Sequence, residues 1–230
     1  MTPPEFDRFA VSYEQDLAKS LSVTGEERNF YAQGRIDWTA QCLSRVQFPV
    51  RRVLDYGCGD GSNLPMLAAR FKTEQALGVD VSSASIARAI QSNSGSGIAF
   101  LTVDEWKPDR SFDLAFCNGV FHHIPVPERK ACLAAIRAAL RSEGVFAFWE
   151  NNPWNPGTRY VMSQCAFDEK AITIAPSEAR RMLQDAGFRV LHSDSLFYFP
   201  RQLRWLRPLE RWLRGVPLGG QYLVLCQNHS

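Results

Sequence analysis

The chain has 230 residues, of which 45% are hydrophobic and 22% charged, and its formal net charge at pH 7 is +2. A chain of this length can fold as one domain with a sizeable core, and this composition excludes a disordered protein. The small net charge disfavours nucleic acid as a partner, because nucleic-acid-binding proteins concentrate basic residues on one face.

The six cysteines are spread over the sequence and form no CxxC pair. They are typical of small buried side chains in a reducing compartment rather than of a disulfide framework or a zinc site. No stretch reaches the roughly 18 apolar residues of a membrane span, and the N-terminal residues lack the basic and apolar regions of a signal peptide. We therefore expect a cytoplasmic location.

Two amphipathic helices are predicted at the start of the chain. Apolar side chains recur at helical spacing over residues 4–20 and again over about 26–46. We interpret residues 1–48 as a helical N-terminal cap in front of an α/β domain over residues 49–230.

Residues 53–64 predict a buried strand, a glycine turn and the start of a helix. Gly57, Gly59 and Gly61 stand at alternate positions, where they permit positive φ and let a ligand approach bare backbone. The dinucleotide-binding fingerprint requires another glycine at the position of Ser62, so the match to that class fails.

Two acids near this turn indicate the ligand. Asp55 lies beside the loop, where a carboxylate would repel a pyrophosphate but suits a ligand that carries an ammonium and a sulfonium. Asp80 follows a second apolar strand, 23 residues after Gly57, and this is close to the spacing at which an acid reaches ribose hydroxyls. The pattern favours S-adenosylmethionine over a dinucleotide.

Strands and helices alternate through the rest of this region. Strands are predicted over residues 52–56, 76–80, 98–102, 112–117 and 144–150, with helices over 61–71, 83–92 and 127–141. Such alternation produces a parallel sheet with helices on both faces, and ligands bind at the C-terminal ends of its strands. Five polar residues fall at that edge on five different strands: Asp55, Asp80, Asp104, Asn118 and Glu150.

Four stretches together resemble the class I S-adenosylmethionine-dependent methyltransferases, from about Arg52 to the C-terminus. The glycine turn with Asp55 is similar to the family's first motif, Asp80 to its acidic ribose position, residues 101–106 to its adenine site and residues 112–124 to its fourth-strand motif. The resemblance implies a Rossmann-like doubly wound sheet of seven strands, mostly parallel. A sixth strand then begins at residue 188, and the last strand, over residues 221–226, runs antiparallel between the fifth and sixth.

The resemblance also implies S-adenosyl-L-methionine as the cofactor. The cofactor-binding residues that it assigns are Tyr13, Asp55, Gly57, Cys58, Gly59, Asp80, Val81, Asp104, Glu105 and Asn118. Amides of the loop and of the following helix would hold the cofactor carboxylate, and Asp55 its ammonium. In the N-terminal segment, Phe9 and Tyr13 would either close the site over the sulfonium or pack in the core.

The catalytic candidates are His122 and His123, directly after the fourth strand. An imidazole titrates near neutrality and can take a proton from an acceptor hydroxyl, and we favour His123 for this role. Oxygen is therefore the first choice of acceptor atom, while carbon and nitrogen stay open. The sequence assembles no oxygen cluster for magnesium, so we predict no metal requirement.

Two insertions, at about 151–175 and 197–219, are expected to cover the acceptor site. The first is too long for a simple connection and is rich in Asn, Trp and Arg. With the end of the fifth strand it supplies the expected substrate-binding residues, which are Trp149, Glu150, Asn151, Trp154 and Arg159.

The second insertion is basic and aromatic. Residues 197–214 contain five arginines and one acid, interleaved with Leu and Trp, and Pro208 is expected to split the segment into two short helices. A segment of this kind either lies on an anionic membrane surface or forms a lid over the pocket.

The sequence therefore predicts methyl transfer to a small or lipid-linked organic acceptor. Alternatives are a C- or N-methyltransferase, a Rossmann oxidoreductase, which Ser62 and Asp55 disfavour, and a non-catalytic scaffold with the same fold. We expect no nucleic-acid partner and possible contact with a membrane through residues 197–214. The oligomeric state is left open.

Overall fold

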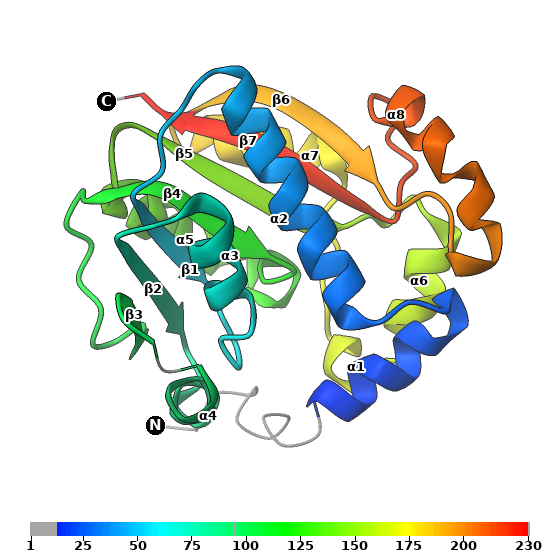
Figure 1. Ribbon diagram of the computed structural model, residues 1–230, viewed down its shortest axis with the longest axis horizontal. Helices are drawn as coiled ribbons and strands as arrows, with labels where there is room; N and C mark the ends of the chain where they lie inside the picture. Colours follow the sequence, from blue (N-terminus) through cyan, green and yellow to red (C-terminus); the bar gives the residue numbers. More distant parts are fainter. Residues whose placement is uncertain (1–12, 94, 230) are drawn as a thin grey trace.

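A seven-stranded sheet forms the centre of the computed structural model, which describes residues 13–93 and 95–229 (Figure 1). The strands are β1 (Arg52–Tyr56), β2 (Gln75–Asp80), β3 (Ile98–Thr102), β4 (Phe112–Asn118), β5 (Leu140–Asn151), β6 (Phe188–Leu196) and β7 (Gln221–Asn228). Their order is β3-β2-β1-β4-β5-β7-β6. The first five pair in parallel, and β7 is antiparallel to both β5 and β6, which confirms the predicted fold class.

Helices cover both faces of this sheet. They are α1 (Tyr13–Leu21), α2 (Arg28–Arg45), α3 (Asn63–Phe71), α4 (Ser83–Ser92), α5 (Val126–Ala139), α6 (Pro156–Ser163), α7 (Pro176–Asp185) and α8 (Glu210–Leu213). Among the described residues, 3-10 helices join them: η2 (Ser22–Thr24), η3 (Phe121–His123), η4 (Ala166–Asp168) and η5 (Arg201–Leu209). Apolar side chains of α2, α3 and α4 pack on one face, and those of α5 and α7 pack on the other.

The central strands are apolar along most of their length because both of their faces are covered. In β4, Leu114 and Phe116 pack on the side of α2 and α3, while Ala115 and Cys117 between them pack on the side of α5. Successive side chains of a strand point to opposite faces, so a strand in the middle of two helical layers needs an uninterrupted apolar run. Polar residues such as Asp80 and Asn118 stand where these strands end, at the edge of the sheet where the cavities lie.

Local capping fixes the helices that border the site. The Ser82 hydroxyl accepts a hydrogen bond from the Ser85 amide at 3.1 Å and begins α4 two residues after β2 ends. The Asn155 side chain accepts from the Thr158 amide at 2.9 Å, and Pro156 occupies the first turn of α6.

Some boundaries differ from the sequence expectation. The helix after the glycine turn begins at Asn63 rather than near Gly61, because Gly61 has a φ of 75° and belongs to the turn. Strand β5 begins at Leu140 rather than at 144, because Leu140 pairs with Phe112 across a register shift. The basic segment forms two helices as expected, but Pro208 lies inside the 3-10 helix η5 and the boundary with α8 falls after Leu209.

The two long connections and the N-terminal helices gather beyond the C-terminal ends of the parallel strands. Figure 1 shows α1, α6 and α8 together at this end of the sheet. Helix α2 extends from there across the sheet and contributes Ile36 and Leu43 to the core. Among the described residues, no helix is long and apolar enough to cross a bilayer. The six cysteines are free, and all except Cys132 are buried.

Candidate active site

Two cavities meet at the C-terminal edge of the sheet. The first, of about 440 Å³, lies over the ends of β1, β2 and β4, and the second, of about 650 Å³, lies between α1, α2, α6 and residues 197–200. Six residues line both of them: Gly57, Gly59, Asn118, Gly119, His123 and Phe167. A molecule in one cavity can therefore meet a molecule in the other across the glycine turn and η3.

The glycine turn presents backbone to both cavities. Gly57, Gly59 and Gly61 have φ values of 75°, 54° and 75°. Residues with a Cβ atom rarely adopt positive φ, whereas glycine does so readily. A Cβ at Gly57 would overlap the side chain of Val120, whereas a Cβ at Gly59 would meet nothing within 4 Å. Gly57 is thus needed for packing, and the space at Gly59 is open to a ligand.

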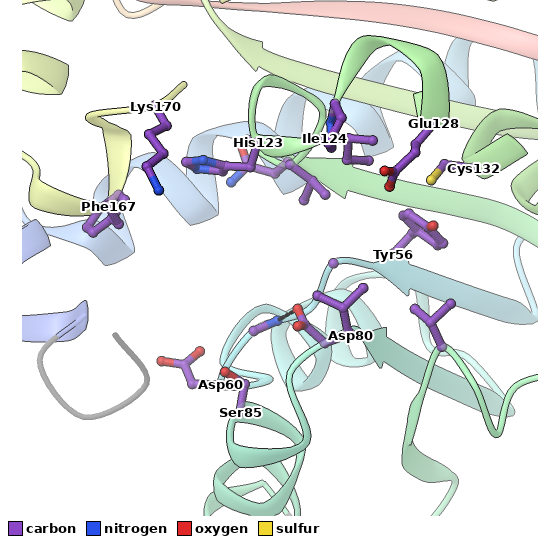
Figure 2. A pocket seen from close by; sticks show the side chains of 18 of the residues that line it. Tyr56, Asp60, Asp80, Ser85, His123, Ile124, Glu128, Cys132, Phe167 and Lys170 are labelled. Atoms are coloured by element: carbon purple, nitrogen blue, oxygen red, sulfur yellow. Dashed lines mark hydrogen bonds between the residues drawn. The ribbon is translucent and has the colours of Figure 1, made fainter. Parts of the chain in front are cut away.

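Asp80 connects the end of β2 to this turn. Its Oδ2 accepts a hydrogen bond from the Gly59 amide at 2.8 Å, and its Oδ1 accepts from the Ser82 amide at 2.9 Å. Figure 2 shows Asp80 on one wall of the first cavity, with His123 and Lys170 on the wall opposite. The carboxylate is held in place by the chain itself, with its oxygens at the cavity wall.

Two buried oxygens at the ends of neighbouring strands lack a hydrogen-bond partner among the described residues. They are Oδ2 of Asp55, at the end of β1, and Oδ1 of Asn118, at the end of β4. Burial, and then the charge of Asp80, raises the pKa of Asp55 to about 7. A cation placed beside these oxygens would satisfy them and restore the charge of Asp55.

His122 is enclosed between two carboxylates. Its Nδ1 lies 2.7 Å from Oε2 of Glu150, and its Nε2 lies 3.3 Å from Oδ1 of Asp168. Burial lowers the pKa of this imidazole, but the two carboxylates outweigh burial and raise it to about 10. Oε1 of Glu150 also accepts from the amides of Phe121 and His122, at 2.9 and 3.3 Å, so β5 fixes the position of η3.

His123 has the opposite electrostatic environment. Its side chain is 14% exposed, its ring centroid lies 4.0 Å from that of His122, and its Nε2 lies 3.4 Å from Oδ1 of Asp168. Burial, and then the positive charge of His122, lowers the pKa of His123 to about 3. At neutral pH the pair therefore consists of a buried imidazolium and a neutral imidazole that borders both cavities.

A family model and a sequence relative both match this chain to methyltransferases. Residues 53–144 match the family model described as a methyltransferase domain. The chain is 25% identical over 218 residues, or 87% of its length and 84% of the relative, to the trans-aconitate 2-methyltransferase of Escherichia coli (strain SE11). Residues 53–144 are thus a methyltransferase domain, and the matches bear out the predicted class I S-adenosylmethionine-dependent methyltransferase.

Solved structures share the fold of this methyltransferase. A SAM-dependent methyltransferase from Thermotoga maritima aligns with a TM-score of 0.67 at 19% identity and covers 97% of both chains. The magnesium protoporphyrin IX methyltransferase of Synechocystis PCC 6803, with bound SAH, aligns with a TM-score of 0.59 at 18% identity, over 92% of this chain and 86% of that chain. S-adenosyl-L-methionine is the cofactor of the enzyme, as predicted.

Most of the predicted cofactor residues lie around the first cavity or the glycine turn. Those that line a cavity are Gly57, Cys58, Gly59, Asp80, Val81 and Asn118, and Asp55 lies buried at the end of β1. Asp104 and Glu105 are exposed and line neither cavity, although their neighbour Val103 lines the first. The Glu105 carboxylate instead accepts from the amide and hydroxyl of Thr102, at 3.0 and 2.8 Å.

The N-terminal predictions fall at the limit of what is described. Tyr13 is the first residue of α1, and its side chain lies outside the described residues. Phe9 also lies outside them.

The predicted substrate-binding residues separate into three groups. Asn151 lines the second cavity, while Glu150 is buried and holds His122. Trp149 is fully buried and lines neither cavity, since its indole N–H donates to the Thr39 hydroxyl at 3.0 Å inside the core. Trp154, which is 45% exposed, and Arg159 both lie outside the second cavity.

Asp168 is a site residue that the sequence analysis did not single out. It comes from η4, about 45 positions after the histidines, and its carboxylate contacts both of them. Its neighbours Phe167 and Lys170 line the first cavity. The only signal in the sequence was the length of the insertion, because no spacing rule relates a loop acid to a distant histidine pair.

Proposed function

We propose that this methyltransferase transfers the methyl group of S-adenosylmethionine to an oxygen of a small or lipid-linked organic acceptor bound in the second cavity. That it methylates a small molecule follows from its family. The choice of oxygen rests on one geometric observation: His123 borders both cavities, and its Nε2 lies 3.4 Å from a carboxylate oxygen of Asp168. A hydroxyl acceptor must lose a proton during methyl transfer, and His123 is the group placed to accept it.

The residues of the first cavity fit this cofactor. Asp55 and Asn118 each have a buried oxygen that an ammonium would satisfy, and the space beside Gly59 admits the amino-acid part of the ligand. Asp80 would accept from the ribose hydroxyls. When bound there, the cofactor supplies a methyl group made electrophilic by its sulfonium.

The histidine pair and its carboxylates would share the work of accepting the proton of the acceptor. His123 accepts the proton of the hydroxyl through its unprotonated ring nitrogen. Asp168, 3.4 Å from Nε2 of His123, then stabilises the imidazolium that forms. Glu150 holds His122 from the other side at 2.7 Å, so η3 keeps His123 at the junction of the cavities. This assigns His122 a positioning role rather than the role of base.

The lining of the second cavity indicates the kind of acceptor. Its wall is largely apolar and aromatic, and it includes Leu17, Leu21, Phe30, Tyr31, Met162, Phe167, Phe197 and Phe199. Polar side chains also line it, among them Arg28, Arg35, Asn151 and Gln221, and the Gln221 side-chain amide donates to Oδ1 of Asn151 at 3.0 Å. The cavity therefore suits an organic acceptor with a large apolar part and a polar end that carries the reactive oxygen.

We also propose a domain organisation and a location. Residues 1–48 and the insertions at 151–175 and 197–219 cover the acceptor site, which is supported by the position of α1, α2, α6 and residues 197–200 around the second cavity. We propose a cytoplasmic enzyme in which residues 49–230 form the methyltransferase domain.

Replacement of His123 by glutamine tests the base role. The variant keeps a polar side chain of similar length but accepts no proton, so the kcat for a hydroxyl acceptor should fall by about 10²–10⁴. Tritium transfer from labelled cofactor to a panel of apolar phenols and hydroxy acids measures turnover, and calorimetry should show unchanged cofactor affinity. Full turnover of the variant at saturating acceptor would exclude the proposal.

The proposed reaction uses no metal, although His122, His123 and Asp168 each offer a ligand atom within 4.8 Å of the others. The same turnover assay distinguishes a base mechanism from a metal-assisted one. Turnover by the parent enzyme that EDTA abolishes and a divalent cation restores would replace the base mechanism with a metal site.

A further inference from the structure

The segment after the second cavity carries an unusual concentration of exposed apolar side chains. Of the fifteen large apolar residues exposed in the described part of the chain, six fall between residues 203 and 218: Leu203, Trp205, Leu209, Trp212, Val216 and Leu218. Trp205 and Trp212 are the most exposed of all, at 71% and 72%. We call these six residues, together with the exposed Arg201, Arg204 and Arg211, the Trp205–Trp212 surface.

The opposite side of this segment is fixed to the body of the protein. Glu210 accepts hydrogen bonds from the amides of Tyr198 and Phe199, both at 3.1 Å. Arg207 forms an ion pair with Glu26 at 2.7 Å, and its guanidinium lies 4.5 Å from the ring centroid of Phe30. The apolar residues are therefore exposed while their own segment is anchored, and the segment needs no movement to present them.

The arginines of the segment divide in the same way. Arg207 and Arg214 turn towards the protein, where Arg214 lies 3.6 Å from the ring centroid of Trp38. Arg204 and Arg211 are exposed and form no ion pair with any described residue. The only acid of residues 201–214 is Glu210, which is turned inward, so the outer side is basic as well as apolar.

This combination favours one kind of partner. Trp and Leu side chains interleaved with arginines are typical of segments that lie at the interface of an anionic bilayer, where indoles reach the headgroup level and arginines meet lipid phosphates. A second copy of the same surface would bring like charges together, which disfavours a symmetric dimer. We propose that the Trp205–Trp212 surface docks the enzyme on an anionic membrane surface.

The position of the surface gives docking a consequence for the reaction. Residues 197–200 line the second cavity and lead directly into η5, and Tyr160 of α6, 54% exposed, lines the same cavity. Figure 1 shows α6 and the segment of η5 and α8 at the same end of the molecule. A docked enzyme would hold the mouth of the second cavity close to lipid. Delivery of the acceptor from the lipid phase rests on the proposed function, whereas docking itself does not.

Co-sedimentation of the full chain with vesicles tests the proposal. The parent protein should sediment with vesicles of phosphatidylcholine and phosphatidylglycerol, and much less with phosphatidylcholine alone. The double variant R204E/R211E should bind at least about tenfold more weakly, since each basic residue near an anionic surface contributes about 1 kcal/mol. W205A/W212A should also lose binding with no change in net charge.

A matched control separates the surface from total charge. R180E/R181E makes the same change in net charge on α7, whose exposed arginines lie over the other face of the sheet. It should bind within about twofold of the parent protein. Cofactor affinity, measured by calorimetry, should be the same in all variants, so a failure of docking is distinguishable from a failure of the proposed reaction.

Three results would overturn the proposal. The first is a parent protein that does not bind anionic vesicles. The second is an equal loss of vesicle binding in R180E/R181E and R204E/R211E, because binding would then depend only on the net charge of the protein. The third is a concentration-dependent dimer that W205A/W212A disrupts in the absence of vesicle binding, which would assign the surface to a second copy of the chain.

Discussion

The two cavities share a wall but are built in different ways. The first is lined mainly by residues within a few positions of a strand end, such as Gly57 after β1, Asp80 at the end of β2 and Asn118 at the end of β4. The second combines segments as distant as Leu17 of α1 and Gln221 of β7. Parallel strand ends bring the first set together in any sheet of this topology, whereas the second set depends on how the insertions pack. The proposed cofactor cavity thus depends on short stretches around the strand ends, and the proposed acceptor cavity depends on how distant segments pack.

The largest effect, a loss of cofactor affinity, is expected for a substitution of Asp80 in the first cavity. Asp80→Ala removes the acceptor for the ribose hydroxyls, and cofactor affinity should fall by at least about a hundredfold, since hydrogen bonds to a charged group contribute about 1.5–3 kcal/mol each. Glu105→Gln is the matched control, because the Glu105 side chain is exposed and bonded to Thr102. Calorimetry should show it within a few-fold of the parent. Equal losses in both variants would mean that the acid after β3 also binds the cofactor.

Two glycines of the same turn should respond differently to one added methyl group. Gly57→Ala would overlap Val120, so the free energy of unfolding should fall by several kcal/mol. Gly59→Ala meets only open space and should cost about 1 kcal/mol for its positive φ, yet it should impair cofactor binding. Denaturant unfolding and calorimetry measure the two quantities. Intact cofactor binding by a folded Gly59→Ala would place the ligand elsewhere.

The pH dependence of turnover tests whether His123 accepts the proton of the acceptor. His123 must be neutral to accept a proton, and its lowered pKa, about 3, should keep kcat/KM for a hydroxyl acceptor flat as pH falls from 8 to about 5. In His122→Gln the neighbouring positive charge is lost, the pKa of His123 rises, and the acid decline should begin at higher pH than in the parent. If the parent enzyme and His122→Gln showed the same pH profile, the group whose titration limits kcat/KM would not be His123.

The smallest effect concerns Trp149. In Trp149→Phe the hydrogen bond to Thr39 is lost inside the core, so the free energy of unfolding should decrease by about 1–3 kcal/mol. The KM for an acceptor should stay unchanged, because the indole lines neither cavity. A raised KM together with an unchanged free energy of unfolding would show instead that Trp149 contacts the acceptor.

The residues differ in how far sequence reasoning could place them. Asp55, Asp80 and Asn118 were predicted at one sheet edge, and they lie there, because apolar runs fix where each strand ends. Glu150 was expected at the acceptor and instead holds His122, because its direction depends on a partner 28 positions away. Asp168 could not have been predicted, since its contacts arise only when the insertion folds over η3.

The sequence by itself determined the sheet, the cofactor and the edge at which we propose the cofactor site. Each of these follows from a short-range pattern: apolar runs in strands, glycines that permit positive φ, and acids that follow strand ends. Only the tertiary structure decided which histidine is neutral and which is charged, because that depends on carboxylates from β5 and η4. It also decided which arginines of the basic segment face outward, since Glu26 and Trp38 hold the others from positions more than 170 residues away.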